Sequence, residues 1–275
     1  MNDQARLEDN RLRWDDAVPH HVRSAFYDMR GFLEGACTLR PFELEELGEV
    51  EGLRLLHLMC HMGQDTLSWA RRGARVTGLD FSGEALRVAR MLAERLEIDA
   101  RFVQAEVTRA AEALDGERFD RVYSSWGVLT WIPDLGAWAR QIHALLVPGG
   151  VFYLAEVHPV AWLFDAQGAK ERRGLERTHG YFGSGRAHSV EAGGSYAAPD
   201  VQLEHVTQHF WTYELGAVIS ALVGAGLQLR WLREHDVAES RILPELVQGD
   251  DGLWRLPPDE PSLPLSFSLQ AVRPG

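Results

Sequence analysis

The stretch from Leu53 to Ser82, LRLLHLMCHMGQDTLSWARRGARVTGLDFS, constrains the fold of this chain more than any other. It opens with an apolar segment, Leu53–Leu58, and closes with a second one, Val76–Asp80, both typical of buried strands. A short helix is predicted between them at Asp65–Arg72. Strand, helix and strand in this order predict a βαβ unit with two parallel strands.

The loop after the first predicted strand, Met59–Gln64, decides what this unit can bind. Loops that hold a nucleoside or dinucleotide usually carry glycines, which let the backbone approach the ligand. Here only Gly63 stands where such a glycine is expected, and Met59 and His61 replace two others. We therefore expect the backbone there to lie further from a ligand or to keep an ordinary conformation. A methionine moiety needs a less close approach than a pyrophosphate, which favours S-adenosylmethionine over NAD.

Acidic residues follow the next two predicted strands. Asp80 comes 17 residues after Gly63, near the spacing between a nucleotide loop and the acid that binds a ribose. Its two oxygens could accept both ribose hydroxyls, and Phe81 beside it is a further candidate for the site. Glu106 stands where an acid could take the adenine amino group, with the N–H of Val107 on a ring nitrogen. A solvated surface acid is the alternative for both carboxylates.

His57, Cys60, His61 and Asp65 together suggest zinc ligands at first sight. However, His57 lies in an extended segment, where residues four apart do not converge, and no glutamate accompanies the pair as in a zinc-protease helix. We expect no metal. The predicted role of His57 is to accept a hydrogen bond from loop N–H groups, where an acid is more usual; a core histidine is the alternative.

Polar and aromatic residues also close the fourth predicted strand, at Ser124, Ser125 and Trp126. Open α/β sheets bind ligands at the carboxyl ends of their strands. Carbonyl groups there could accept from a ligand ammonium, and an indole beside a sulfonium is favourable. Trp126 as core filler is the alternative.

Three residues are candidates for an acid or base on the acceptor side: Glu156 and His158, which close the fifth predicted strand, and His209, which ends an irregular stretch. A hydroxyl or protonated amine acceptor needs a base, whereas a carboxylate or thiolate does not. Each histidine taken alone is more often structural than catalytic.

Alternating strands and helices predict an α/β fold with a doubly wound, mostly parallel sheet. The predicted strands are Leu53–Leu58, Val76–Asp80, Ala100–Gln104, Arg121–Ser124, Val151–Glu156, Leu227–Glu234 and Leu265–Val272. We expect one domain over 1–275. Its parts are an N-terminal helical cap (1–50), a cofactor-binding half (51–158), an irregular lid or substrate insertion (159–212), and a C-terminal helix with a closing β-hairpin (213–275). Inside the cap, helices are expected around Leu7–Trp14 and from Pro41.

The net charge of −12 (28 basic against 40 acidic residues) disfavours nucleic acid or an anionic membrane as a partner. No apolar run is long enough to cross a bilayer, and the first residues show no signal-like apolar segment, so a cytoplasmic location is expected. We interpret the two cysteines, Cys37 and Cys60, as reduced thiols. A monomer or homodimer is expected.

The chain resembles the class I S-adenosylmethionine-dependent methyltransferases of the small-molecule type, from about Phe26 to Pro274. The resemblance rests on the Leu53–Ser82 stretch, on FDRVYSSWGVLTWIPDLGAWARQIHALLVPGGVFYLAEVHP and on SLPLSFSLQAVRP. It implies a Rossmann-like sheet of seven strands, the last antiparallel and inserted between the fifth and sixth. It also implies that Met59–Gly63 holds the methionine end, Asp80 the ribose, and Glu106 with Val107 the adenine.

The loop departs from the family pattern, since His57 replaces the usual acid. A subgroup with a similar HLxCHxGxDT loop implies a variant rather than a decayed site. Tyr27 and Arg40 in the cap could close over the cofactor, Arg40 toward a carboxylate. The predicted activity is methyl transfer to a small molecule, with O, N, S or carboxylate as acceptor and S-adenosylhomocysteine as product. A non-catalytic S-adenosylmethionine-binding protein and an NAD-dependent oxidoreductase remain alternatives.

Overall fold

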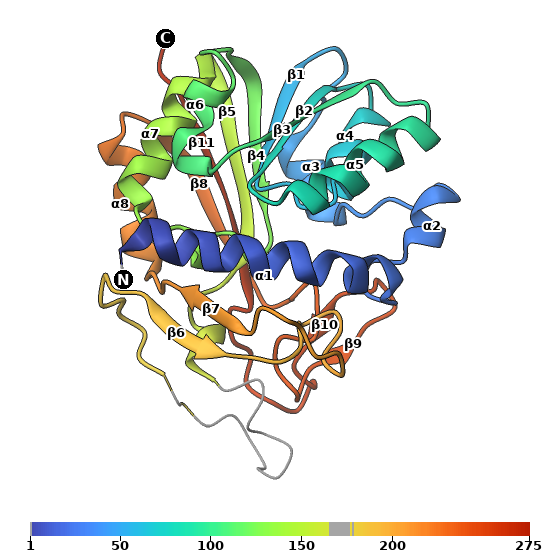
Figure 1. The fold of residues 1–275 in the computed structure, drawn as a ribbon. Coiled ribbons are helices and arrows are strands. Elements are labelled where there is room, and N and C mark those ends of the chain that lie inside the picture. Colours follow the sequence, from blue (N-terminus) through green and yellow to red (C-terminus); the bar gives the residue numbers. More distant parts are fainter. Residues whose placement is uncertain (1, 165–176, 178) are drawn as a thin grey trace.

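The structure is a computed structural model that describes residues 2–164, 177 and 179–275 (Figure 1). Its centre is a seven-stranded sheet in the order β3-β2-β1-β4-β5-β11-β8. Only β11 is antiparallel to its neighbours, β5 and β8. The predicted fold is thereby confirmed. The strands are β1 (Arg54–Leu58), β2 (Arg75–Asp80), β3 (Ala100–Gln104), β4 (Phe119–Ser125), β5 (Leu146–Val157), β8 (Gln228–His235) and β11 (Ser266–Val272).

Helices cover both faces of the sheet, as Figure 1 shows. One face carries α3 (Pro41–Leu47), α4 (Gln64–Ala70) and α5 (Gly83–Arg95), and the other carries α6 (Ala110–Ala113), α7 (Leu135–Leu145) and α8 (Leu215–Gly224). Apolar side chains pack between each helical layer and the sheet, for example Trp69 from α4 and Trp138 from α7. This burial is the main source of stability. Two short 3-10 helices, η1 (Val107–Arg109) and η2 (Leu129–Trp131), follow β3 and β4.

Local sequence explains where several elements begin. The Ser82 hydroxyl accepts a hydrogen bond from the Ala85 N–H and so caps α5, a role for which serine is well suited. The fifth strand was expected to begin at Val151, after Pro148-Gly149-Gly150. Instead β5 already begins at Leu146, and its pairing with β4 shifts register between Phe119 and Arg121.

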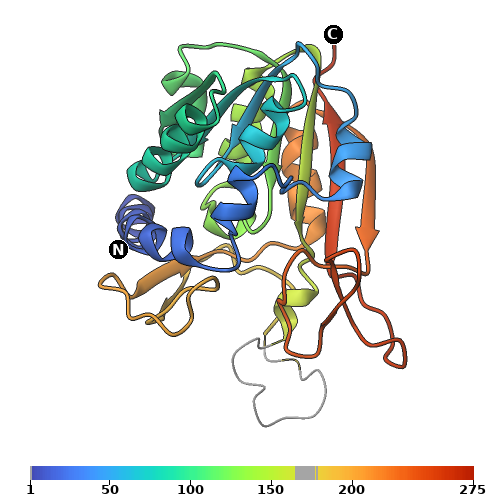
Figure 2. The same ribbon diagram turned by 90° about the vertical axis from the view of Figure 1, so that its right-hand side faces the viewer.

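Helix α1 (Asp3–Arg23) is much longer than the predicted Leu7–Trp14 segment. Both views place it along one end of the sheet, between the strands and a hairpin formed by β6 (His188–Glu191) and β7 (Thr207–Phe210) (Figures 1 and 2). Asn10 fixes the hairpin to α1, because its side chain both donates to the His209 carbonyl and accepts from the His209 N–H. α1 therefore lies between the insertion and the sheet.

The remaining segments contain more regular structure than the sequence predicts. The insertion was expected to lack periodicity, but β6 and β7 pair in antiparallel register. Residues 165–176 and 178 of that predicted lid lie outside the described residues. The proline-rich stretch before β11 likewise contains two short paired strands, β9 (Val247–Gln248) and β10 (Trp254–Arg255). A short helix, α2 (Met29–Leu33), and the 3-10 helix η3 (Ala161–Leu163) complete the described elements. None of these helices is long and apolar enough to cross a membrane.

We expect Gly63→Ala to lower the free energy of unfolding by about 2–4 kcal/mol. A Cβ on Gly63 would lie 2.9 Å from both Ala89 Cβ and Phe102 Cε1, and its φ of +75° is strained for alanine. The exposed Gly116 is a control with a similar φ of +69°, and a Cβ there meets nothing within 4 Å. Gly116→Ala should cost only the strain, about 1 kcal/mol. Equal losses in urea denaturation would contradict the close packing at Gly63.

Candidate functional site

The loop after β1 follows a glycine-type path although two of its glycine positions are substituted. Met59, His61 and Gly63 all have left-handed backbones, with φ of 59°, 47° and 75°. The expectation of an ordinary conformation at Met59 and His61 was therefore wrong. Three hydrogen bonds fix the path: Cys60 N–H to Leu79 O, Gly63 N–H to Cys60 O, and His61 N–H to the Asp80 carboxylate. These tertiary contacts offset the local strain of about 1–2 kcal/mol per residue.

This strain can be measured by comparing two truncations of Met59. In most positions alanine is more stable than glycine, because glycine loses more backbone entropy on folding. At Met59 we expect the reverse, with Met59→Gly about 1 kcal/mol more stable than Met59→Ala. Both variants lose the same thioether side chain, so chemical denaturation of the pair isolates the backbone term. A more stable alanine variant would show that the left-handed conformation is wrong.

Asp80 lies directly beneath this loop, at the end of β2, and is only 6 % exposed. Its Oδ2 accepts from the His61 N–H at 2.8 Å and its Oδ1 from the Ser82 N–H at 2.9 Å. Burial raises the pKa of Asp80 to about 6, opposed by these N–H groups, so the carboxylate is ionised at neutral pH. Since each carboxylate oxygen can accept two hydrogen bonds, both retain capacity for a ligand donor.

Glu106 stands at the start of η1, next along the same end of the sheet. It is partly buried, and its Oε1 accepts from Gln4 Nε2 of α1 at 2.7 Å. Val107 beside it is buried, and the Phe81 carbonyl accepts from Gln104 Nε2 at 3.0 Å. Glu106 is thus a contact of α1 rather than a free surface acid, and the adenine role of these residues stays a prediction.

Helix α1 covers the site residues along this end of the sheet. The Trp14 ring lies 5.1 Å from the His61 ring, and His21 Nδ1 lies 3.0 Å from His61 Nε2. Next to Trp14, Asp15 Oδ1 accepts from the Ser82 hydroxyl at 2.6 Å. Sequence reasoning missed Trp14 and His21, because only the fold brings α1 against the loop. The only local indication in the sequence was that Trp14 ends the predicted Leu7–Trp14 helix and that His21 follows it closely.

His57 has a different partner from the one predicted. Its Nδ1 lies 2.8 Å from Thr66 Oγ1 in α4, and no loop N–H donates to it. The ring packs against Tyr123, and Nε2 has no hydrogen-bond partner among the described residues. Burial lowers the pKa of His57 to about 4, so the ring is neutral. Both cysteines are free, and the described residues contain no group of three or more potential metal ligands.

Arg40 lies at the N-terminal end of α3, where it meets a protein carboxylate. Its Nη2 is 2.9 Å from Glu239 Oε2, in the segment after β8. Its Nε is buried and has no hydrogen-bond partner in the described structure. Tyr27 is also near the loop, with its ring 5.3 Å from that of His61 and its carbonyl accepting from Gln64 Nε2. Tyr27 thus lies beside the Met59–Gly63 loop, whereas Arg40 is held by Glu239.

The side chains of the residues that close β4 form hydrogen bonds with other protein groups. The Ser124 hydroxyl donates to the Leu58 carbonyl at 3.1 Å, and the Ser125 hydroxyl to Asp65 Oδ2 at 3.2 Å. Trp126 Nε1 lies 3.4 Å from Glu43 Oε2, and its ring packs against Phe42. Trp126 therefore packs toward α3, which favours the core role over a contact with the sulfonium.

Glu156 holds the turn after β4. Its carboxylate accepts from four backbone N–H groups, those of Gly127, Val128, Leu129 and Val157, at 2.6–3.0 Å. It is 2 % exposed, and although burial raises its pKa, these N–H groups oppose the shift. A carboxylate with four donors has no free lone pair for a proton from substrate. This favours a positioning role for Glu156 rather than that of a base.

The two candidate histidines, His158 and His209, have side-chain partners that differ from those of Glu156. His158 Nδ1 accepts from the Val160 N–H, and its Nε2 lies 3.0 Å from Glu234 Oε1. His209 Nε2 lies 3.0 Å from Asp9 Oδ2 in α1, and its Nδ1 lies 2.7 Å from the Ser189 hydroxyl. Each of the three candidates thus contacts a different element, so the structure does not assemble them into one acid–base group.

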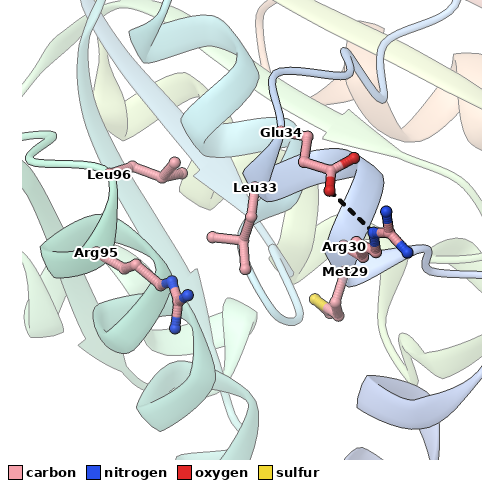
Figure 3. Close-up of a pocket in the computed structure, with 6 residues that line it drawn as sticks. All are labelled: Met29, Arg30, Leu33, Glu34, Arg95 and Leu96. Atoms are coloured by element: carbon pink, nitrogen blue, oxygen red, sulfur yellow. Dashed lines mark hydrogen bonds and ion pairs between the residues drawn. The ribbon is translucent and has the colours of Figure 1, made fainter.

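A separate groove lies between α2 and the C-terminal end of α5 (Figure 3). It has a volume of about 450 Å³ and shares no residue with the site described above. An ion pair between Arg30 and Glu34 crosses one side of it, and Leu33 and Leu96 line its apolar part. It is an apolar surface groove away from the strand ends that carry Asp80 and Glu106.

Comparison with known proteins identifies the family. Residues 55–150 match the model of a methyltransferase domain. The chain is 30 % identical over 166 residues to the ubiquinone biosynthesis O-methyltransferase of Serratia proteamaculans, covering 56 % of this chain and 68 % of the relative. The chain belongs to the S-adenosylmethionine-dependent methyltransferases. The enzyme of the same name from Alkalilimnicola ehrlichii is 33 % identical over 153 residues, and this chain spans 61 % of that relative's length.

A solved structure agrees on the fold. An S-adenosylmethionine-dependent methyltransferase from Mesorhizobium loti superimposes with a TM-score of 0.60 at 24 % identity, covering 88 % of this chain and all of the other. Within this methyltransferase, the matched 55–150 segment runs from β1 into β5 and so contains the left-handed loop, Asp80, Glu106 and the end of β4. The insertion, α8 and the closing hairpin lie outside it.

Proposed function

We propose that this methyltransferase transfers a methyl group from S-adenosylmethionine to a small-molecule acceptor. One observation carries the proposal: the left-handed loop Met59–Gly63 donates its His61 N–H to Asp80, so loop and acid form one unit at the ends of β1 and β2. The same end of an open α/β sheet is where ligands of this class bind.

The described residues fit this cofactor. Asp80 retains acceptor capacity for the ribose hydroxyls, and Glu106 with Val107 lies one strand further for the adenine. The buried Nε of Arg40, which has no hydrogen-bond partner in the described structure, suits the methionine carboxylate. When bound, S-adenosylmethionine supplies an electrophilic methyl group on a cationic sulfonium. The protein then mainly aligns the acceptor and excludes water.

The small-molecule acceptor is supported by the relatives, which are ubiquinone biosynthesis O-methyltransferases. That name does not fix the acceptor atom of this chain, whose insertion and closing hairpin lie outside the family match. Because Glu156 is fully engaged by backbone N–H groups, we do not assign it as the base. His158 and His209 remain candidates for that base. A cytoplasmic enzyme remains the expectation from composition, and a metal-independent one the expectation from the spacing of His57, Cys60 and His61.

Calorimetric titration with S-adenosylmethionine, S-adenosylhomocysteine and NAD separates this proposal from its alternatives. We expect both sulfur ligands to bind and NAD not to bind, and methyl transfer to appear in an acceptor panel with methyl-labelled S-adenosylmethionine. Binding without turnover across hydroxyl, amine, thiol and carboxylate acceptors would favour a non-catalytic binding protein. Binding of NAD alone would favour an oxidoreductase and overturn the proposal.

A further inference from the structure

The Asp65 carboxylate joins the carboxyl ends of β1 and β4. From β1 the chain continues to β2 and β3 on one side of the sheet, whereas β4 and β5 lie on the other side. In open α/β sheets, ligands bind at the strand ends where the winding changes direction in this way. Asp65 belongs to α4, which follows β1, and its Oδ2 accepts from the Ser125 hydroxyl at the end of β4 at 3.2 Å. Asp65 therefore lies at the point of the sheet where a ligand is expected.

The hydrogen bonds of Asp65 lead away from its own helix. Its Oδ1 accepts at 2.5 Å from the hydroxyl of Thr38, a residue between α2 and α3. Asp65 is the second residue of α4, but both hydrogen bonds of its side chain in the described structure go to residues outside that helix. Helix capping therefore does not explain where this carboxylate lies.

The charge of Asp65 is not neutralised by the protein. In the part of the chain that the structure describes, this carboxylate forms no ion pair, and both of its donors are neutral hydroxyls. Each carboxylate oxygen can accept a second hydrogen bond, and the residue is partly exposed. A ligand that covers this end of the sheet would remove water from the charge, which is costly unless the ligand supplies a cation.

A second contact brings the segment before α3 against the same end of β4. Glu43 Oε2 accepts from the Arg40 N–H at 2.8 Å and from Trp126 Nε1 at 3.4 Å. Since Trp126 directly follows Ser125, this contact lies beside the one made by Asp65. The buried Nε of Arg40 has no hydrogen-bond partner among the described residues. An acidic and a basic group with free hydrogen-bonding capacity thus lie at this end of the sheet, as the amino-acid part of a cofactor requires.

We propose that Asp65 binds the α-ammonium group of S-adenosylmethionine and so fixes the methionine end of the cofactor. This inference rests on the proposed function. S-adenosylmethionine has two cationic groups, the sulfonium and the ammonium, but only the ammonium has N–H groups that a carboxylate can accept. The Met59–Gly63 loop, which we propose for the methionine end, ends two residues before Asp65.

The test compares S-adenosylhomocysteine with its deamino analogue, in which hydrogen replaces the amino group. Both ligands keep the adenosine and the carboxylate, so the ratio of their dissociation constants isolates the ammonium. In calorimetry, we expect the unaltered protein to bind S-adenosylhomocysteine at least about tenfold more tightly than the analogue. Asp65→Asn keeps the shape of the side chain, and in this variant the ratio should fall below about threefold while the affinity for the analogue changes by less than about twofold.

Glu84→Gln is a matched control. Glu84 is likewise the second residue of its helix, α5, and its carboxylate pairs with Arg87 at 2.9 Å. The variant removes one acid from the first turn of a neighbouring helix, so it should keep the ratio of about ten.

A ratio that survives in Asp65→Asn would overturn the proposal. Equal weakening of both ligands would also overturn it, because that result indicates a purely structural link between Thr38 and Ser125. If the variant does not fold, a crystal structure of the unaltered protein with S-adenosylhomocysteine decides the question. We expect the ligand nitrogen within about 3.2 Å of an Asp65 oxygen, and a nitrogen bound only by other groups would contradict the assignment. Failure of both ligands to bind would overturn the proposed function and this inference with it, whereas the other outcomes concern Asp65 alone.

Discussion

Glu156→Ala should lower the free energy of unfolding by about 3–5 kcal/mol, because it leaves four backbone N–H groups, three of them in buried residues, without their acceptor. Those groups belong to Gly127, Val128 and Leu129 after β4 and to Val157 at the end of β5. Water can recover only part of the loss in a site where the carboxylate is 2 % exposed. Urea denaturation measures the change.

Two controls make this result specific. Glu156→Gln keeps the shape and one acceptor oxygen, so it should lose less than the alanine variant but still more than 1 kcal/mol. Glu260→Ala removes an exposed carboxylate and should stay within about 0.5 kcal/mol of the unaltered protein. If Glu156→Ala were no worse than Glu260→Ala, the carboxylate would not hold the turn after β4.

Asp80→Ala should weaken S-adenosylhomocysteine binding by tenfold or more, on the order of 1.4 kcal/mol. The carboxylate is placed to accept ribose hydroxyls, and it also fixes the loop through the His61 N–H. Asp80→Asn keeps one acceptor oxygen and should lie between the alanine variant and the unaltered protein. Isothermal titration calorimetry measures all three, and unchanged affinity in both variants would remove Asp80 from the site.

The pH dependence of binding gives an independent test of Asp80. Burial raises its pKa in the folded protein from 3.8 to about 6. For the free protein, the contribution of Asp80 to stability is therefore fully present below pH 3.8 and is lost as the pH rises through 6. A ligand that needs the ionised form should bind less tightly as the pH falls through 6. Asp80→Asn should lack this dependence; an identical pH profile would exclude Asp80 as its source.

The sheet could be predicted because its signals are local. Apolar segments separated by helices predicted the parallel strands. The resemblance to class I methyltransferases predicted that the last strand is antiparallel and inserted between the fifth and sixth. Asp80 and Glu106 also follow from position, since they end or follow strands whose carboxyl ends meet at one edge of the sheet.

Features set by distant contacts could not be predicted. Residue type argues against a left-handed backbone at Met59 and His61. The loop is held in it by hydrogen bonds that include those to Leu79 and Asp80 of β2. The β6–β7 hairpin has an exposed β6 without apolar alternation, and it is fixed by Asn10 of α1, which is far away in the sequence. The contacts of Trp14 and the four donors to Glu156 could not be predicted either, because they too join residues that are far apart in the sequence.

A crystal structure with S-adenosylhomocysteine tests the central claim most directly. We predict that both ribose hydroxyls lie within hydrogen-bonding distance, about 2.5–3.2 Å, of the Asp80 carboxylate. The homocysteine end should lie against Met59–Gly63, whose left-handed conformation should be unchanged. A ligand bound elsewhere, or a ribose without contact to Asp80, would contradict the account.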